Sequence, residues 1–541
     1  MTETSTNSPL ARRLLVGAAL VVSFLLVALD VGLAHYGAPA DELFYHEASR
    51  RHVAWLGVIS KPGAFSEKTI QEGFAWRPEF VIHPTFSRWC SGLAWLVGHH
   101  WLGLDEIVAL RLHNAVAFAL IAWGIVGYML PRYGTIPAVV GLVLVWADVR
   151  LFGHAHTAQT DLVLACTWLW AVLFAVRAIH DGSRGALIAS ALIAGFALAT
   201  KMTGILLVAV LAGWPLWVHG RRGLWMTAAF VLVPPLVFYA LNPQSWHHPL
   251  VWTLNWLDQF AAREAETIIP SLVFGQKYVF RAPWYTAALH GLITIPPAIL
   301  LLAAIAATDT VRWFWQADRD QLWHKLRSPW MLLTAAGAAP LVACSLPGAP
   351  NHDLERLFLP TQPLLILAAA YGFWIIAQSR WLARAFSRWP RCPAWLPGAV
   401  LAAVILLPAV AAAVRAHPYE LTYFNMLVGG PRGADRLGFD VAYLKQEFNA
   451  EALDALNEHL PEGAALWSNF LYLDLVLHQH AGRLRKDIRL VPNFADADYV
   501  LIHGRRSWMQ PPERQLFDQP QRAVWRLEPH GVVLIALFPR N

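Results

Sequence analysis

Two acidic positions stand where apolar runs end or begin, which is where a membrane enzyme can carry out acid–base chemistry. Asp41 and Glu42 follow the first apolar run, in the segment GAPADELFYHEASR. A carboxylate held at the membrane surface can take a proton from an acceptor hydroxyl as a general base. The structural alternative is that Asp41 caps a helix continuing through ELFYHEASR, with Glu42 in its first turn.

Asp161 is the second acidic candidate, at the head of an apolar run in HAHTAQTDLVLACTW. An ionisable group at the edge of a membrane span is a functional hypothesis by default, although an acid at a helix N-terminus is also favourable without any function. His154 and His156 precede it two residues apart, which is the wrong spacing for one helical face. They could bind a metal from an extended segment, or be ordinary interface histidines.

Basic and polar side chains expected on the same side of the membrane complete the candidate set. They are His83 in RPEFVIHPTFSRW, Lys201, and His352 with Arg356 in NHDLERLFLP. A guanidinium can hold a phosphate by its planar fork, while the ordinary alternative is snorkelling towards lipid phosphates. The sequence contains no strong metal-ligand set, so no cofactor is certain and a divalent metal stays an open alternative.

Composition indicates that membrane helices position these residues. Hydrophobic residues make up 57% of the 541 residues and charged ones 14%, and the 27 Trp and 26 Phe are typical of membrane-interface belts. The mean hydropathy is +0.42. The net charge is only +6, without a long basic block that would favour nucleic acid. These values exclude a disordered chain, a cytosolic enzyme and a coiled coil, and they predict a polytopic membrane protein.

About eleven apolar runs are long enough to be read as transmembrane helices. They lie near 14–33, 107–130, 133–150, 158–177, 186–199, 203–218, 224–241, 285–307, 329–346, 358–378 and 396–415. One alternating set of short loops holds most of the Arg and Lys, and the positive-inside rule places that set in the cytoplasm. The N-terminus is then cytoplasmic, and an odd number of spans leaves the C-terminal tail outside.

The predicted fold class is an all-α polytopic membrane bundle of about 11 transmembrane helices with a small C-terminal soluble α/β domain. The bundle covers 1–415, with long outer loops at 35–106 and 242–284, and the extracytoplasmic domain covers 416–541. In this tail EALDALNEHL has helical periodicity, and four segments are typical of short strands. They are AALWSNF, IRLVPNF, DYVLIHG and GVVLIALF. Large outer segments favour chemistry or binding at the outer membrane face.

Five segments occur in an order that resembles the GT-C membrane glycosyltransferases, in particular the branch that depends on a phospholipid carrier. They are ADELFYHEASR, HPTFSRW, TDLVLACTW, FALATKMTG and HDLERLFLP. That branch includes protein O-mannosyltransferases and aminoarabinose transferases. The tract HPYELTYFNMLVGGPRGA at 417–434 is similar to one in its bacterial members, and the resemblance covers 10–435.

The resemblance implies a mechanism and a role for each candidate residue. A sugar linked to a polyprenyl monophosphate is presented at the outer face, the acceptor attacks and inverts the anomeric carbon, and polyprenyl phosphate leaves. Asp41 would be the general base, Glu42 would complete the acidic pair, and Asp161 would orient the acceptor or sugar. The substrate-binding residues would be Lys201 and Arg356 at the carrier phosphate, with His83 and His352 near them.

The expected partners are a polyprenyl-phosphate-sugar donor, an acceptor protein, lipid or glycan, and membrane lipid, without nucleic acid. The expected location is a bacterial inner (plasma) membrane. One alternative is a carrier or flippase for a lipid-linked sugar, which would not need Asp41 as a base. The absence of a detectable internal repeat and the large outer segments weigh against it. A scaffold without catalytic activity is a further alternative.

Overall fold

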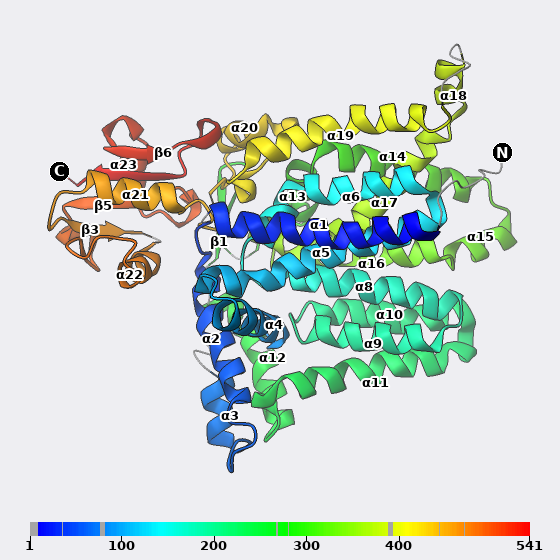
Figure 1. Cartoon of the computed structure of the whole chain (residues 1–541), viewed down its shortest axis with the longest axis horizontal. Coiled ribbons are helices and arrows are strands. Elements are labelled where there is room, and N and C mark those ends of the chain that lie inside the picture. The colour runs from blue at the N-terminus through cyan, green and yellow to red at the C-terminus, as the bar shows by residue number, and fades with distance from the viewer. Residues whose placement is uncertain are drawn as a thin grey trace.

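Long helices lie side by side in a bundle, and a small sheet packs at one end of it (Figure 1). The computed structural model describes residues 9–34, 36–75, 82–266, 269–279, 281–387, 393–442, 444–469 and 471–540. The helices that coincide with the predicted spans are α1 Pro9–Ala34, α5 Glu106–Tyr133, α6 Thr135–Ala147, α8 Asp161–His180, α9 Arg184–Leu198, α10 Gly204–His219, α11 Leu224–Leu241, α14 Pro297–Trp315, α16 Pro329–Cys344, α17 Thr361–Ala377 and α19 Leu396–Ala416.

Not all of these helices meet the length and composition of a membrane span. Among the described residues six segments do, or eight if each of two bent helix pairs is one span, while α9 and α16 are shorter apolar helices. One of the six, Gly204–Leu241, contains α10 and α11, which pack against each other, and Thr227 Oγ1 of α11 donates to the carbonyl oxygen of Ala212 in α10. The structure is therefore mostly helical with six to eight candidate spans, and the count of eleven stays a prediction.

The helix that carries Asp161 lies at the centre of the bundle. In its most apolar window 83% of α8 is buried inside the protein, against 22% for α1, so α8 packs on protein and α1 faces outwards. Trp168 of α8 donates its indole N–H to the carbonyl oxygen of Ala336 in α16 at 3.1 Å. Near α8, α14 and α17 approach so closely that a Cβ on Gly372 would lie 1.9 Å from the carbonyl oxygen of Leu302. Only glycine permits this approach.

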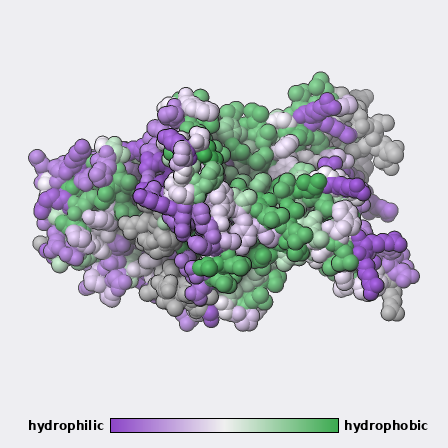
Figure 2. Space-filling view, turned by 90° about the horizontal axis from the view of Figure 1, so that it is seen from below, coloured by the Kyte–Doolittle hydropathy of each residue, from purple (hydrophilic) through white to green (hydrophobic). Residues whose placement is uncertain are grey.

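Shorter helices cover the two ends of the bundle. At the end that faces the sheet are α2 Ala40–Leu56, α3 Glu67–Phe74, α4 Phe86–Trp95, α7 Val149–Ala155, α12 Pro249–Glu266 and α13 Thr286–Thr294. At the opposite end, α15 Arg319–Leu326 and α18 Arg380–Phe386 lie near the N-terminus (Figure 1). Figure 2 shows hydrophobic residues gathered over the helical bundle and hydrophilic ones towards the two ends. This distribution fits a bundle embedded in lipid.

The tail contains a five-stranded sheet of order β4-β3-β5-β7-β6. Its strands are β3 Ala465–Ser468, β4 Arg489–Leu490, β5 Tyr499–His503, β6 Trp525–Leu527 and β7 Ile535–Pro539, and its helices are α20 Gly430–Arg436, α21 Ala450–His459, α22 Tyr472–His480 and α23 Pro511–Phe517. The four expected strands and the EALDALNEHL helix are present, whereas β6 was not predicted. Nor was the hairpin of β1 Pro270–Val273 and β2 Gln276–Val279. The domain boundary at 416 stays a prediction.

Candidate functional site

Arg356 is the side chain around which the predicted candidates gather. It lies in the 3-10 helix Leu354–Phe358. Its Nη2 lies 3.1 Å from Asp41 Oδ2, its Nε 3.0 Å from Asp161 Oδ2, and its Nη1 3.4 Å from Asp353 Oδ2. Burial lowers the pKa of Arg356, but the three carboxylates raise it well above its ordinary value. One guanidinium therefore holds three acids from three distant parts of the chain.

Asp161 bridges two cations at the first turn of α8. Besides the contact with Arg356, its Oδ1 accepts from Lys201 Nζ at 2.6 Å, just past the end of α9. The Asp161 side chain is almost completely buried, and a buried carboxylate persists in charged form only when it is paired. Lys201, Asp161 and Arg356 therefore form one connected charge network, which brings together three separate motifs of the sequence.

We call Arg356, Lys201 and the carboxylates Asp41, Asp161 and Asp353 the Arg356 cluster. Asp41 is its most exposed carboxylate. Its side chain is 44% exposed, against 1% for Asp161 and 11% for Asp353. It lies in the first turn of α2, whose N-cap residue is Pro39, and no side chain caps this helix. The capping alternative for Asp41 is therefore wrong. Among the described residues its Oδ1 makes no hydrogen bond, so that oxygen remains available to an acceptor.

Glu42 points away from this cluster. Its two carboxylate oxygens accept from Arg111 of α5 at 2.6 and 3.1 Å, and His46 Nε2 lies 3.0 Å away. Burial raises the pKa of Glu42, but Arg111 and His46 lower it, to about 2. The structure thus uses Glu42 to fasten α2 against α5, which fixes the helix that carries Asp41.

Glu42→Gln should lower the free energy of unfolding by about 3 kcal/mol, because it leaves the buried Arg111 guanidinium without its carboxylate. The ordinary pKa of a Glu is about 4.3. Since the folded value is depressed, this stabilisation is complete above about pH 4.3 and is lost as the pH falls towards 2. Unfolding in detergent, followed by helical circular dichroism at several pH values, measures both effects. Glu106→Gln, which breaks the exposed pair with Arg50, is the control and should change stability little.

Of the two candidate histidines, His352 contacts the cluster and His83 contacts Arg88. His352 Nδ1 is 3.3 Å from Asp353 Oδ2, so it contacts one of the three acids that surround Arg356. His83 is buried, and its carbonyl oxygen accepts from Arg88 Nη2 at 2.7 Å. The HAH pair shares no metal site, because His154 Nε2 lies 3.0 Å from Glu355 and His156 Nε2 lies 2.9 Å from Asp30.

Arg88 of α4 is a cation that the sequence reasoning missed. It is 1% exposed, its Nε donates to His52 Nε2 at 3.3 Å, and its Nη1 has no hydrogen-bond partner among the described residues. Burial lowers its pKa to about 10, and Tyr45 opposes that shift. Burial and then Asp41 raise the pKa of Tyr45, while Arg356 and Arg88 lower it, so Tyr45 lies near both Arg88 and Arg356. The sequence feature that could have pointed to Arg88 is its place inside the HPTFSRW motif.

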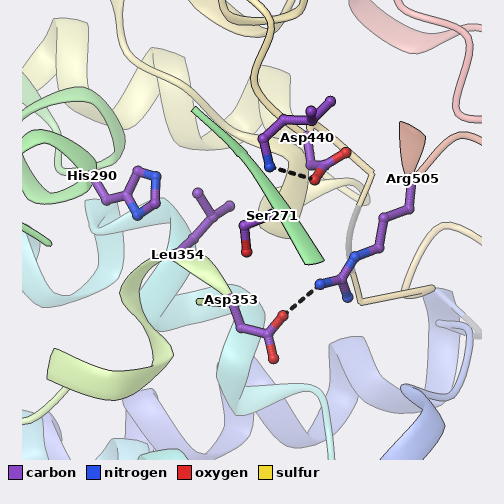
Figure 3. A pocket seen from close by; sticks show the side chains of 7 residues that line it. Ser271, His290, Asp353, Leu354, Asp440 and Arg505 are labelled. Carbon is purple, nitrogen blue, oxygen red and sulfur yellow. Dashed lines mark hydrogen bonds and ion pairs between the residues drawn. The ribbon is translucent and has the colours of Figure 1, made fainter. Parts of the chain in front are cut away.

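Asp353 and Arg505 connect the cluster to the C-terminal tail. Arg505 follows β5, and its Nη2 lies 2.7 Å from Asp353 Oδ1 (Figure 3). Asp353 and Leu354 both have left-handed backbones, with φ of 55° and 53°, a conformation that costs free energy in residues other than glycine. The Arg505 contact thus fastens a strained turn directly before Arg356. Arg505 and Asp353 are 152 residues apart, so no local sequence pattern predicts this contact.

Arg505→Gln should reduce the transfer rate roughly tenfold, since small misplacements of a catalytic group can cost up to about 10²-fold. The measurement is turnover by purified protein in lipid vesicles. Arg483→Gln is the matched control: Arg483 also joins the tail to the bundle, through Asp105 at 2.8 Å, but does not contact Asp353. Equal losses in the two variants would contradict a specific role for Arg505.

Residues 83–252 match the family model described as dolichyl-phosphate-mannose-protein mannosyltransferase. The predicted glycosyltransferase resemblance is confirmed. His83, Asp161 and Lys201 lie inside the matched part of the chain, whereas Asp41 and Arg356 lie outside it. The six to eight candidate spans among the described residues fit a multi-pass membrane protein. No curated protein sequence matches it.

Several solved structures are similar to this chain at low sequence identity. ArnT from Cupriavidus metallidurans bound to undecaprenyl phosphate is 15% identical, with 98% of each chain covered and a TM-score of 0.49. Its apo state is 16% identical, with 97% of each chain covered and a TM-score of 0.46. The archaeal oligosaccharyltransferase AglB from Archaeoglobus fulgidus, in complex with an inhibitory peptide and a dolichol-phosphate, is 11% identical. The match covers 91% of this chain and 70% of the AglB chain, with a TM-score of 0.47.

Proposed function

We propose that this glycosyltransferase moves a sugar from a polyprenyl-monophosphate donor to an acceptor hydroxyl or phosphate at the outer membrane face, with inversion. The observation that carries the proposal is the cluster itself. A half-exposed carboxylate, Asp41, lies against a buried guanidinium, and Asp161 connects that guanidinium to Lys201. General-base catalysis needs such an accessible carboxylate, and a phosphate leaving group needs nearby cations.

In the proposed reaction Asp41 Oδ1 takes the acceptor proton while the acceptor oxygen attacks the anomeric carbon. The bond to the carrier phosphate breaks on the opposite face, which inverts the configuration. Arg356 and Lys201 stabilise the charge that develops on the departing phosphate, and Arg88 contributes a third buried cation. Arg356 and Lys201 both contact Asp161 and are therefore held close together. A single departing phosphate can for this reason interact with both cations.

A divalent metal does not fit this cluster as it stands. Asp161 contacts two cationic side chains, Asp353 contacts two arginines, and Asp41 contacts one. A further cation would have to displace these partners and would be repelled by them. No step of the proposed reaction is therefore routed through a metal at this site.

The wider setting is proposed on the same basis. The description of the matched family names a dolichyl-phosphate sugar, which supports a polyprenyl-phosphate donor. We place the N-terminus in the cytoplasm of a bacterial inner membrane, with eleven spans to 415 and an extracytoplasmic domain over 416–541. The long segments and the sheet lie together at one end of the bundle, which favours a site on that side (Figure 1).

The deciding experiment supplies purified protein in vesicles with a panel of polyprenyl-phosphate sugars and candidate acceptors. Release of polyprenyl phosphate that depends on the acceptor supports transfer and identifies the donor, and the anomeric configuration of the product tests inversion. Movement of intact donor across the bilayer, with no bond broken, would instead favour a carrier for lipid-linked sugars.

A further inference from the structure

A second group of polar side chains converges where α1 ends and the HPYELTYFNM tract begins. Asp30 comes from the last turns of α1, His156 from the end of α7, and His417 and Glu420 from the segment that follows α19. Their ligand atoms are close together: His417 Nδ1 lies 2.9 Å from Glu420 Oε1 and 3.7 Å from Asp30 Oδ2, and His156 Nε2 lies 2.9 Å from Asp30 Oδ2.

This spacing fits a small metal ion. Ligand atoms bound tetrahedrally to Zn²⁺ at about 2.0–2.2 Å lie about 3.3 Å from one another. The potential ligand atoms of Asp30, His417 and Glu420 all lie within 4.8 Å of one another. His156 Nε2 does not belong to this group of three, but it lies beside Asp30 Oδ2. Two imidazole nitrogens and two carboxylate oxygens form a common zinc donor set.

The Tyr36 hydroxyl has more neighbouring acceptors than protons. Tyr36 has a single hydroxyl proton, yet its oxygen lies 3.0 Å from Asp30 Oδ2, 3.1 Å from Glu420 Oε1 and 3.1 Å from His417 Nδ1. Glu420 is 1% exposed, and its Oε2 has no hydrogen-bond partner among the described residues. Nor does either carboxylate form an ion pair with Lys or Arg in that part of the chain. A bound cation would satisfy these acceptors and offset their charge.

His156 is held in the form that binds metals. Its Nδ1 lies 2.7 Å from the carbonyl oxygen of Phe152. A carbonyl only accepts, so Nδ1 carries the proton, and in the neutral ring Nε2 directs its lone pair towards Asp30. Such a backbone contact behind a histidine is typical of metal ligands. The His417 side chain is 41% exposed and the Asp30 side chain 19%, which leaves an entry path for an ion.

We propose that Asp30, His156, His417 and Glu420 bind one Zn²⁺ ion at the outer end of the bundle. The ion joins α1, α7 and the segment after α19, which are far apart in the sequence and meet here. It is a structural site, distinct from the Arg356 cluster, with which the four residues share no ion pair in the described part of the chain. It goes beyond the proposed glycosyl transfer.

The test measures metal content and thermal stability rather than transfer. Full-length protein is stripped with a chelator, reloaded with Zn²⁺ alone and desalted. Wild type should retain about one ion per chain and melt at a higher temperature than the stripped form, because an ion bound only to the folded state stabilises it. Loading with Co²⁺ should give the visible absorption of tetrahedral coordination.

The near-isosteric double variant Asp30→Asn with Glu420→Gln should lose the ion and the thermal shift. The control pair Glu67→Gln with His248→Ala removes an exposed Glu–His contact of 3.7 Å and should bind like wild type. Wild type that retains no stoichiometric Zn²⁺, or a double variant that retains as much, would overturn the proposal. The wild-type cobalt spectrum decides the question even if the double variant folds poorly. Neither outcome depends on whether sugar is transferred.

Discussion

Asp41→Asn should lower the rate of sugar transfer by about 10²–10⁴-fold, the usual contribution of a positioned general base. Asparagine has nearly the same shape as aspartate and can still accept from Arg356, so α2 should keep its position. It cannot take the acceptor proton. The loss should therefore appear in kcat, with little change in KM for the lipid-linked donor. The measurement is acceptor-dependent release of polyprenyl phosphate in vesicles.

Glu47→Gln is the matched control for this experiment. Glu47 lies on the same helix, but it pairs with Arg50 and Arg51 and touches none of the cluster. It should transfer sugar at nearly the wild-type rate. If Asp41→Asn retained wild-type turnover while releasing polyprenyl phosphate, Asp41 would not be the base.

Arg356→Met should abolish transfer and also lower the free energy of unfolding by about 3–5 kcal/mol, the usual cost of removing one partner of a buried ion pair. The substitution leaves Asp161 and Asp353 buried with one cation fewer each. It also removes a cation from the place where the leaving phosphate gathers charge. Thermal unfolding and donor turnover in the same preparation measure the two effects.

Arg356→Lys separates the two roles of this side chain. An ammonium restores the charge but not the planar fork, so it cannot contact three carboxylates at once. Much of the stability should return, while transfer should stay at least about 10²-fold below wild type. Arg50→Lys is the control, because its partners Glu47 and Glu106 are partly exposed. Full activity of Arg356→Lys would show that a point charge suffices.

The sequence predicted much of the cluster because each member sits at a boundary between polar and apolar segments. Asp161 begins α8, Lys201 follows α9, and Arg356 precedes α17, so hydropathy alone places all three at the ends of helices. Their order along the chain, compared with a known family, then assigned all three to one expected site. The long apolar helices were equally predictable, because a run of apolar residues is a local feature of the sequence.

The direction in which a side chain points around a helix was harder to predict. Asp41 and Glu42 were expected to act as a pair, yet neighbours on a helix do not face the same way. The structure accordingly turns Glu42 to Arg111 and Asp41 to Arg356. Arg505 could not be found at all from local pattern, because its contact with Asp353 depends on how the sheet docks. The short strand β6 is defined by pairing with β7, a long-range event as well.

The docking of Arg505 also orders events during synthesis. Arg505 directly follows β5, and β5 pairs along its whole length with β7, from His503 opposite Ile535 to Tyr499 opposite Pro539. The helices that carry Asp41, Asp161 and Arg356 leave the ribosome long before β7 does. Until β7 arrives, the strained turn before Arg356 lacks its anchor. We therefore expect the full transfer rate only after β7 has been synthesised, later than the membrane helices that precede it.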